Sequence, residues 1–468
     1  MPPTGGAAGG GGAQASSPAA ALGSPSSWLP CALALAKVPQ PFIPWPEPED
    51  EAPAALASKA SAHEDDAHFL AWHARDPNLL LHKALYFALC AALAAYVPYL
   101  VQWMRTIGLS PLQAGSIFAI GQLTGMVGSP LLARLADSSE AHRRALLLAA
   151  MVGQILALLA MSQCTSYGAV ALCFVGCELC TVVIFPLLDA SIQRLLTAVY
   201  GDASGYGATR AWGAAGWGIF GWVFGALYDN VGGHAQLFTF FAIAQLPCIA
   251  LGAYLPLERR AASASSDRVA YTALLRWDFA AVALVLMLCS ILLTALDLYR
   301  FSYLETLGAS NELMGISLAA ASLSETPFFF FTGAILSRTG VGRALIVCAV
   351  GYSVRYVWYA YLVDPRLTVP AELLHGVTFA LSWSAGTQYI AEILPPELAS
   401  TGQGLLSALV WGVGGSLGSL FGGGIVSAWG WQPMWLSGAA LALAAASIMA
   451  AALAACPRKG AGAVPLAG

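Results

Sequence analysis

Three ionisable side chains interrupt apolar runs in the second half of this 468-residue sequence. Arg355 stands among aromatic and aliphatic residues in the stretch 351–361, His375 follows twenty residues later, and Glu325 precedes both. An arginine does not lose its charge inside a protein, so a buried one needs a carboxylate, and we expect Arg355 to pair with Glu325. This set is either a structural salt bridge or a proton site, in which Arg355 tunes a titratable Glu325 beside His375.

A second charged set belongs to the same half of the chain. Asp297 and Arg300 are three residues apart, which places them on one face of a helix as a structural pair, and Glu372 comes three residues before His375. We expect Arg300 and Glu372 to form an ion pair. The alternative is that both side chains extend to the outer interface, because both lie near the ends of their apolar runs.

The first half carries an acid, a base and an aromatic ring with the spacing of a binding site. Asp189 follows Pro186 at the end of one apolar run, Arg210 opens the next, and Trp217 lies seven residues beyond Arg210, or two helical turns. A carboxylate and a forked guanidinium both hydrogen-bond hydroxyl groups, so this set suits a sugar-like solute. An interfacial ion pair with a membrane-belt tryptophan is the alternative. Glu178, eleven residues before Asp189 on the same face, either lines the cavity or bonds a neighbouring helix.

These residues belong to a chain with the composition of a membrane protein. Apolar residues make up 58% of the sequence and charged residues only 10%, whereas soluble domains have about 25% charged residues. We predict an all-α membrane protein with twelve transmembrane helices in two six-helix bundles, because twelve apolar windows are long enough to cross the bilayer as a helix. These windows are 80–104, 112–133, 144–163, 168–189, 208–228, 236–256, 279–300, 313–336, 344–363, 370–392, 402–426 and 433–456.

The predicted organisation has five parts. Residues 1–79 form a tail that is disordered because it is rich in Ala, Gly, Pro and Ser. Residues 80–256 and 279–456 form the two bundles, and residues 257–278 form the cytosolic loop between them. Residues 457–468 form a short C-terminal tail. An organelle transit peptide is the alternative for the first segment. The inner loops and C-terminal tail would hold thirteen basic residues and the outer loops three. We therefore expect both termini in the cytosol, in a monomer of the plasma membrane, an endomembrane or an organelle envelope.

Two basic loops indicate an internal repeat. Residues 132–144 and 333–343 follow the second and eighth windows, which are equivalent positions in two six-helix halves. Such a pair is typical of a parallel repeat about the membrane normal. Both loops resemble the G-x-x-x-D-R-x-G-R-R signature of the major facilitator superfamily, although the first lacks the leading Gly and the second has Ser337 in place of Asp.

Other strings resemble the lactose permease-like branch of that superfamily and eukaryotic proteins with the related MFS-associated domain. Residues 206–217 look like the start of helix 5 in those carriers, with the Arg and the Trp in place. Arg355 and His375 resemble the Arg of helix 9 and the His of helix 10, and the strings 372–379 and 395–404 look like the eukaryotic branch.

The resemblance implies roles for these residues. Asp189, Arg210 and Trp217 match the acid, Arg and stacking Trp that hold a galactoside ring in such carriers. The acid of helix 8, the Arg of helix 9 and the His of helix 10 belong there to a network that couples proton and sugar. Thr378 stands where those carriers have their proton-carrying acid, so Glu325 or Glu372 would have to take that role here.

We therefore expect a secondary active transporter that moves a small polar organic solute, sugar- or nucleoside-like, by alternating access and coupled to protons. A passive uniporter and a non-transporting receptor or scaffold with the same fold are the alternatives. We expect no enzyme chemistry, cofactor, metal or nucleic acid. The stretch 216–221 fits a dinucleotide-binding G-x-G-x-x-G pattern, but it lies inside an apolar helix and follows no strand.

Overall fold

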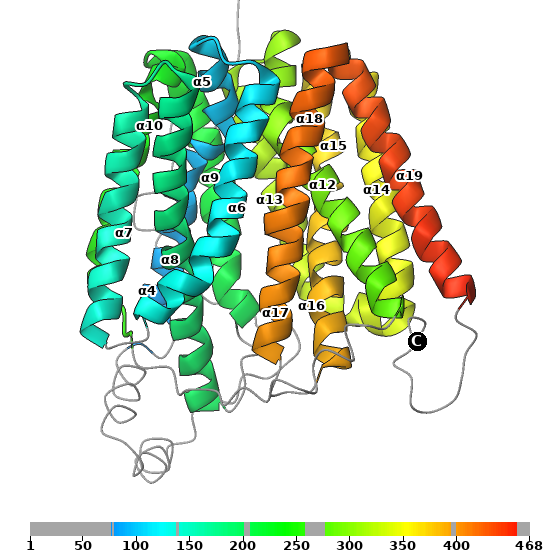
Figure 1. The fold of residues 1–468 in the computed structure, drawn as a ribbon, viewed down its shortest axis with the longest axis horizontal. Helices are drawn as coiled ribbons and strands as arrows, with labels where there is room; N and C mark the ends of the chain where they lie inside the picture. The colour runs from blue at the N-terminus through cyan, green and yellow to red at the C-terminus, as the bar shows by residue number, and fades with distance from the viewer. Residues whose placement is uncertain are drawn as a thin grey trace, which may run out of the picture. The chain divides into compact units, whose positions relative to one another are not determined.

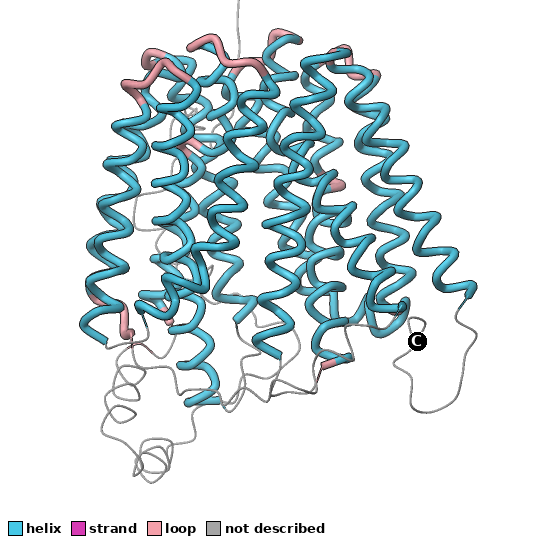
Figure 2. Tube along the Cα trace, in the orientation of Figure 1, coloured by secondary structure: helices cyan, strands magenta, loops and turns pink. Residues whose placement is uncertain are grey.

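The computed structural model describes residues 76, 79–136, 140–200, 206–257, 277–394 and 399–455, and the regular structure among them is entirely helical (Figure 2). These residues belong to one compact unit, Pro53–Gly468. The two predicted tails and nearly all of the predicted loop at 257–278 lie outside the described residues. Asp76 is described, and its carboxylate accepts hydrogen bonds from the backbone N–H groups of Leu80 (2.6 Å) and Leu81 (2.9 Å), which caps the first helix.

The described helices form twelve consecutive segments, one for each predicted window (Figure 1). The first six segments are α4 with η3 and α5 (Leu80–Ala94, Val97–Tyr99, Leu100–Thr106), α6 (Pro111–Ala136), α7 (Glu140–Met161), α8 (Tyr167–Tyr200), α9 (Tyr206–Asn230), and η4 with α10 (Gly233–Gln236, Leu237–Ala253). The second six are α12 (Trp277–Thr306), α13 (Asn311–Thr339), α14 (Val341–Ala360), η5 and α15 with η6 and α16 (Pro365–Leu367, Thr368–Glu372, Gly376–Ala380, Leu381–Ile393), α17 with η8 and α18 (Ala399–Ser407, Ala408–Gly414, Gly415–Trp429), and α19 (Trp431–Ala455).

Not every segment is apolar enough to be recognised as a membrane span by composition. Eight helices in the described part of the chain pass that test, and α13 makes a ninth if its two bent halves count as one span. The others are α9, α14 and the broken segment of α15 and α16. Glycines lower the mean hydropathy of α9, Arg343 and Arg355 lower that of α14, and the segment of α15 and α16 is broken into two short helices.

The turns 105–115 and 305–315 are two copies of one structure. Gly108 and Gly308 adopt left-handed φ angles of 87° and 79°, a conformation that costs glycine little. The hydroxyls of Ser110 and Ser310 then accept hydrogen bonds from the N–H groups three residues on, at 3.2 and 3.1 Å. The copies are 200 positions apart and begin the second helix of each half, as a parallel repeat requires.

Glycines allow the two halves to touch at the end of the helices that carries these turns. Helix α6 packs on α18, and α9 packs on α13 (Figure 1). A Cβ at Gly115 would collide with the backbone of Ser419, and a Cβ at Gly315 would lie 2.7 Å from Cα of Trp222. The Asp229 carboxylate, at the end of α9, also caps α13 by accepting from the N–H groups of Asn311 and Glu312 at 3.1 and 2.8 Å. The two halves are therefore in direct contact at this end.

Candidate functional site

A completely buried ion triad occupies the second half. The carboxylate of Glu372, at the end of α15, accepts hydrogen bonds from Nη2 of Arg355 at 2.9 Å (Oε1) and 2.8 Å (Oε2), and a further one from Nη1 of Arg300. The side chains of Arg300, Arg355 and Glu372 are 2%, 0% and 0% exposed. Such burial is tolerated only because each charge has a partner.

The triad contains one predicted pair and corrects another. The expected Arg300–Glu372 pair is present, and its burial excludes the alternative that both side chains extend to the interface. Arg355, however, pairs with Glu372 and not with Glu325. Helix α15 ends at Glu372, and this position brings the carboxylate between α12 and α14, closer to Arg355 than Glu325 on α13.

His375 joins the triad to Glu325. Nη1 of Arg355 lies 3.2 Å from Nδ1 of His375, and a guanidinium can only donate, so Nδ1 is the acceptor and carries no proton. The ring proton is then on Nε2, which lies 2.9 Å from Oε1 of Glu325. Nε2 of His375 therefore donates to Glu325 in this geometry. The side chain of Glu325 is 13% exposed, in contrast to the fully buried Glu372.

The hydroxyls of Tyr359, Thr368 and Thr378 complete this cluster, and sequence analysis singled out Thr378 alone among them. The Tyr359 hydroxyl donates to Oε1 of Glu372 at 2.6 Å and contacts the Thr368 hydroxyl at 2.7 Å. Thr378 accepts from Nη1 of Arg355 at 2.8 Å. The spacing of Tyr359, four residues after Arg355, was a usable signal because it puts both on one helical face.

Asp297 lies at the edge of the same cluster. It is half-buried on α12, one turn from Arg300, and its charge acts on both Arg300 and Arg355. The cluster thus holds two permanent positive charges, on the arginines, and three carboxylates, on Asp297, Glu325 and Glu372.

The first half holds a smaller polar cluster. Asp189 lies inside α8, not at its end as predicted, because α8 continues to Tyr200. Its carboxylate accepts hydrogen bonds from the hydroxyls of Tyr86 and Tyr206. Nη1 of Arg210 donates to the Tyr206 hydroxyl at 3.2 Å, and the Arg210 side chain is otherwise exposed. A phenol therefore bridges the predicted Asp–Arg pair, and most of the guanidinium donors are left open.

The other two predicted residues of the first half are both half-buried. Trp217 lies on α9 between Gly216, which packs against the backbone of Phe87 on α4, and Gly218, which packs against Ser322 on α13. Trp217 thus lies where α9 contacts one helix of each half. Glu178 lies on α8 and packs against α6, where a Cβ at Gly121 would come 2.9 Å from its Cγ.

Residues of both clusters lie near Cys90. The thiol of Cys90 on α4 is within electrostatic range of Asp189 and Arg210 from the first half and of Glu325 from the second. Glu325 also lies one turn beyond Ser322, the residue against which Gly218 packs. Arg355, in contrast, is completely buried inside its own half. It is connected to Glu325 through its contact with His375.

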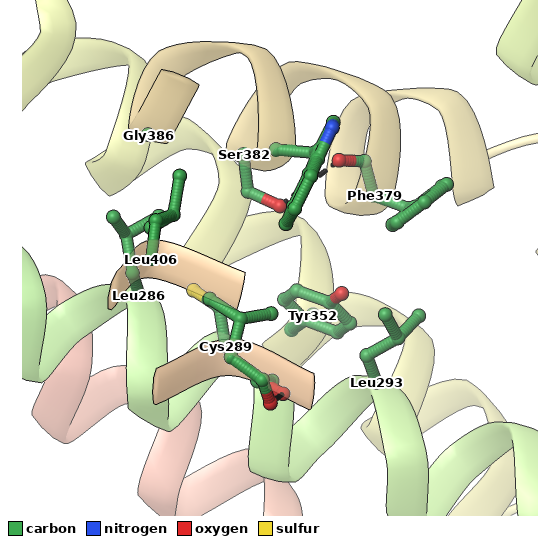
Figure 3. Close-up of a pocket in the computed structure, with 11 residues that line it drawn as sticks. Leu286, Cys289, Leu293, Tyr352, Phe379, Ser382, Gly386 and Leu406 are labelled. Carbon is green, nitrogen blue, oxygen red and sulfur yellow. Dashed lines mark hydrogen bonds between the residues drawn. The ribbon is translucent and has the colours of Figure 1, made fainter. Parts of the chain in front are cut away.

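A narrow cleft lies within the second half beside His375. It is lined by α12, Tyr352 of α14, η6 with α16, and the segment from Leu406 to Val410. Figure 3 shows Phe379 and Ser382 on one side, across from Cys289, with Tyr352 and Leu293 also lining the cleft. The cleft has about 300 Å³ of empty volume, which includes its open mouth, and this leaves room for about one water molecule.

Comparisons with known proteins agree on one kind of protein. The model of the "MFS_1 like family" matches residues 79–437. The maltose permease of Geobacillus stearothermophilus is 28% identical over 350 residues, which cover 74% of this chain and 86% of that protein. A zebrafish (Danio rerio) protein, major facilitator superfamily domain-containing protein 6-like, is 31% identical over 150 residues, 32% of this chain and 28% of that protein. The crystal structure of the nucleoside transporter NupG superposes with a TM-score of 0.66 and 20% identity, over 80% of this chain and 99% of that one.

Proposed function

The chain belongs to the MFS_1 like family of the major facilitator superfamily of transporters, and we propose that it is a proton-coupled carrier of a small polar solute, sugar- or nucleoside-like. The relatives named maltose permease and NupG support these two solute classes. The polar cluster of Asp189, Arg210 and Tyr206, with Trp217 two turns away, offers hydroxyl-binding groups and a ring surface, as either class requires.

The charge count of the second cluster supports coupling to a single proton. Two arginines and the carboxylates of Asp297, Glu325 and Glu372 sum to −1 when His375 is neutral. Protonation of Glu325 brings the sum to zero. His375 is a poor site for the proton, because a second N–H at Nδ1 would point at the Arg355 guanidinium. Glu325 therefore carries the proton, and His375 and Arg355 position and polarise it.

The contacts between the halves support alternating access. The halves meet through glycines and the Asp229 cap at the end that carries the turns 105–115 and 305–315. If both termini are cytosolic, this is the outer side, and the halves are closed toward the outside in this state. A carrier must then break these small-residue contacts to open outward.

The position of Glu325 carries this proposal, because it is the acid of the buried cluster that reaches the region shared with Asp189 and Arg210. The test is uptake of labelled sugars and nucleosides into proteoliposomes, with and without an inward proton gradient. We expect the gradient to stimulate uptake by the wild type at least several-fold and to have no effect on Glu325→Gln. Glu392→Gln, which changes an exposed acid at the end of α16 that contacts Gln388, is the matched control and should behave like the wild type.

The alternatives give different results in the same experiment. For a uniporter, the rate of uptake would be the same with and without the proton gradient, and it would be unchanged in Glu325→Gln. A receptor or scaffold would take up none of the solutes under any gradient.

A further inference from the structure

Trp411 has an unusual position for an exposed aromatic side chain. It is 40% exposed, yet it lies in the middle of the span Gly402–Trp429, where membrane-belt tryptophans are not found. Its neighbours fix its position: Gly412 packs against Met126 of α6, and Gly414 packs against Ser290 of α12. Trp411 therefore lies on a turn that contacts α6 of one half and α12 of the other, at the boundary between the halves.

Two further rings hold Trp411 in place. Its ring centroid lies 6.0 Å from that of Phe379 and 5.6 Å from that of Trp383. Phe379 in turn lies 5.5 Å from the ring of His375, so this aromatic group adjoins the Glu325–His375 pair. The π-helical turns η6 and η8 supply Phe379 and Trp411, and such turns occur frequently at functional sites.

We infer that Trp411, supported by Phe379 and Trp383, is a stacking platform for a flat unsaturated ring of the transported solute. This inference rests on the proposed function and narrows its solute class to nucleobase-like heteroaromatic compounds. An exposed indole face favours a π-system, and stacking tolerates different bases because each has a π-face. The ring lies on the platform and not in the cleft behind it, since the enclosed space of that cleft holds only one water molecule.

The platform also places the solute close to the groups already described. A ring on Trp411 would lie beside Phe379, which contacts His375, and we place Arg210 and Asp189 of the first half across from it. A ribose or another hydroxyl-bearing group attached to the ring could then reach those two side chains. The two halves would thus bind different parts of one molecule.

The test is equilibrium binding of labelled adenosine, uridine and maltose to the full chain in nanodiscs, with the substitutions Trp411→Leu and Trp411→Phe. We expect the wild type to bind nucleosides, Trp411→Leu to lose about 10- to 100-fold in nucleoside affinity, and Trp411→Phe to stay within about threefold. Trp429→Leu is the matched control: Trp429 is 71% exposed at the end of the same helix and should be dispensable.

Binding and transport separate this inference from the proposed function. The inference is overturned if the wild type binds no nucleoside, or if Trp411→Leu binds nucleosides as tightly as the wild type. If uptake of maltose is gradient-driven in such a case, the carrier proposal stands without the platform. If nucleosides bind through Trp411 but no solute is taken up, the platform stands and the carrier proposal fails.

Discussion

Arg105 and Glu305 occupy equivalent positions in the two copies of the repeated turn, and Nη1 of Arg105 lies 3.0 Å from Oε2 of Glu305. The same guanidinium nitrogen donates to the Ser302 carbonyl at 3.2 Å. The two residues differ in charge although the turns around them match, so the repeat has diverged at the point where its copies meet. This pair crosses between the halves at their closed end.

Exchanging the two charges tests this contact. We expect Arg105→Glu to favour opening of this end, because two acids then face each other, and the double variant Arg105→Glu/Glu305→Arg to restore the wild-type behaviour. The effect is modest, about 1 kcal/mol or less, since the side chains are 34% and 40% exposed. The coupling can be measured by a double-mutant cycle on uptake rates at low salt, and it should weaken at high salt. Additive effects of the two substitutions would show that the pair is not coupled.

Glu372→Gln should strongly destabilise the fold. The carboxylate neutralises two arginines inside the protein, and removing one partner of a buried pair costs about 3–5 kcal/mol. The measurement is thermal unfolding of the purified protein in detergent. Glu305→Gln, in which the acid is exposed, should cost less than about 1 kcal/mol. Equal stability of the two variants would mean that the triad does not stabilise the protein.

Apolar windows predicted the helices because the length needed to cross a bilayer is a strong local constraint. They did not predict where helices continue past the apolar stretch. The α8 helix extends to Tyr200, and Asp189 is for this reason about three turns inside it. Helix propensity and contacts with neighbours, not hydropathy, determine such ends.

The charged residues of the second half were also found from the sequence, since a charge in an apolar run is costly and therefore visible. Their pairing was only partly predictable. Depth along a helix follows from residue counting, but the distances between helices do not, and both Glu325 and Glu372 are within reach of Arg355 by depth. Because the helix breaks after α15, Glu372 and not Glu325 pairs with Arg355. Counting residues from the helix ends does not predict this pairing.

The two nitrogens of His375 should have separable roles. In His375→Gln, the glutamine side-chain NH₂ can take the place of Nε2 and still donate to Glu325. In His375→Asn, the asparagine side-chain oxygen can take the place of Nδ1 and accept from Arg355. We expect gradient-driven uptake to survive in the Gln variant, within about tenfold of the wild type, and to be lost in the Asn variant. Proteoliposome uptake with and without a proton gradient decides this. The opposite ranking would place the essential contact at Arg355.

Arg210→Lys should weaken solute binding without loss of charge. Arg210 donates one hydrogen bond to Tyr206. A lysine ammonium cannot reproduce the forked geometry of the remaining guanidinium donors. We expect the apparent KM for uptake to rise about tenfold, equivalent to about 1.4 kcal/mol, with little change in stability. The exposed Arg366 is the control, and Arg366→Lys should leave the KM unchanged. An unaltered KM in Arg210→Lys would remove the bidentate role assigned to this side chain.

Gly315→Leu should prevent the halves from closing at the end that carries the repeated turns. A Cβ there would lie 2.7 Å from Cα of Trp222, which is backbone and cannot move aside without separating α13 from α9. Ser322 lies two turns further along the same contact and is 5% exposed. A cysteine introduced by Ser322→Cys should therefore react several-fold faster with a membrane-impermeant maleimide, added on the side of the repeated turns, when Gly315→Leu is also present. Gly424→Leu is the matched control, because a Cβ at Gly424 meets nothing within 4 Å. If the labelling rate is the same in both backgrounds, the glycine contact does not hold this end closed.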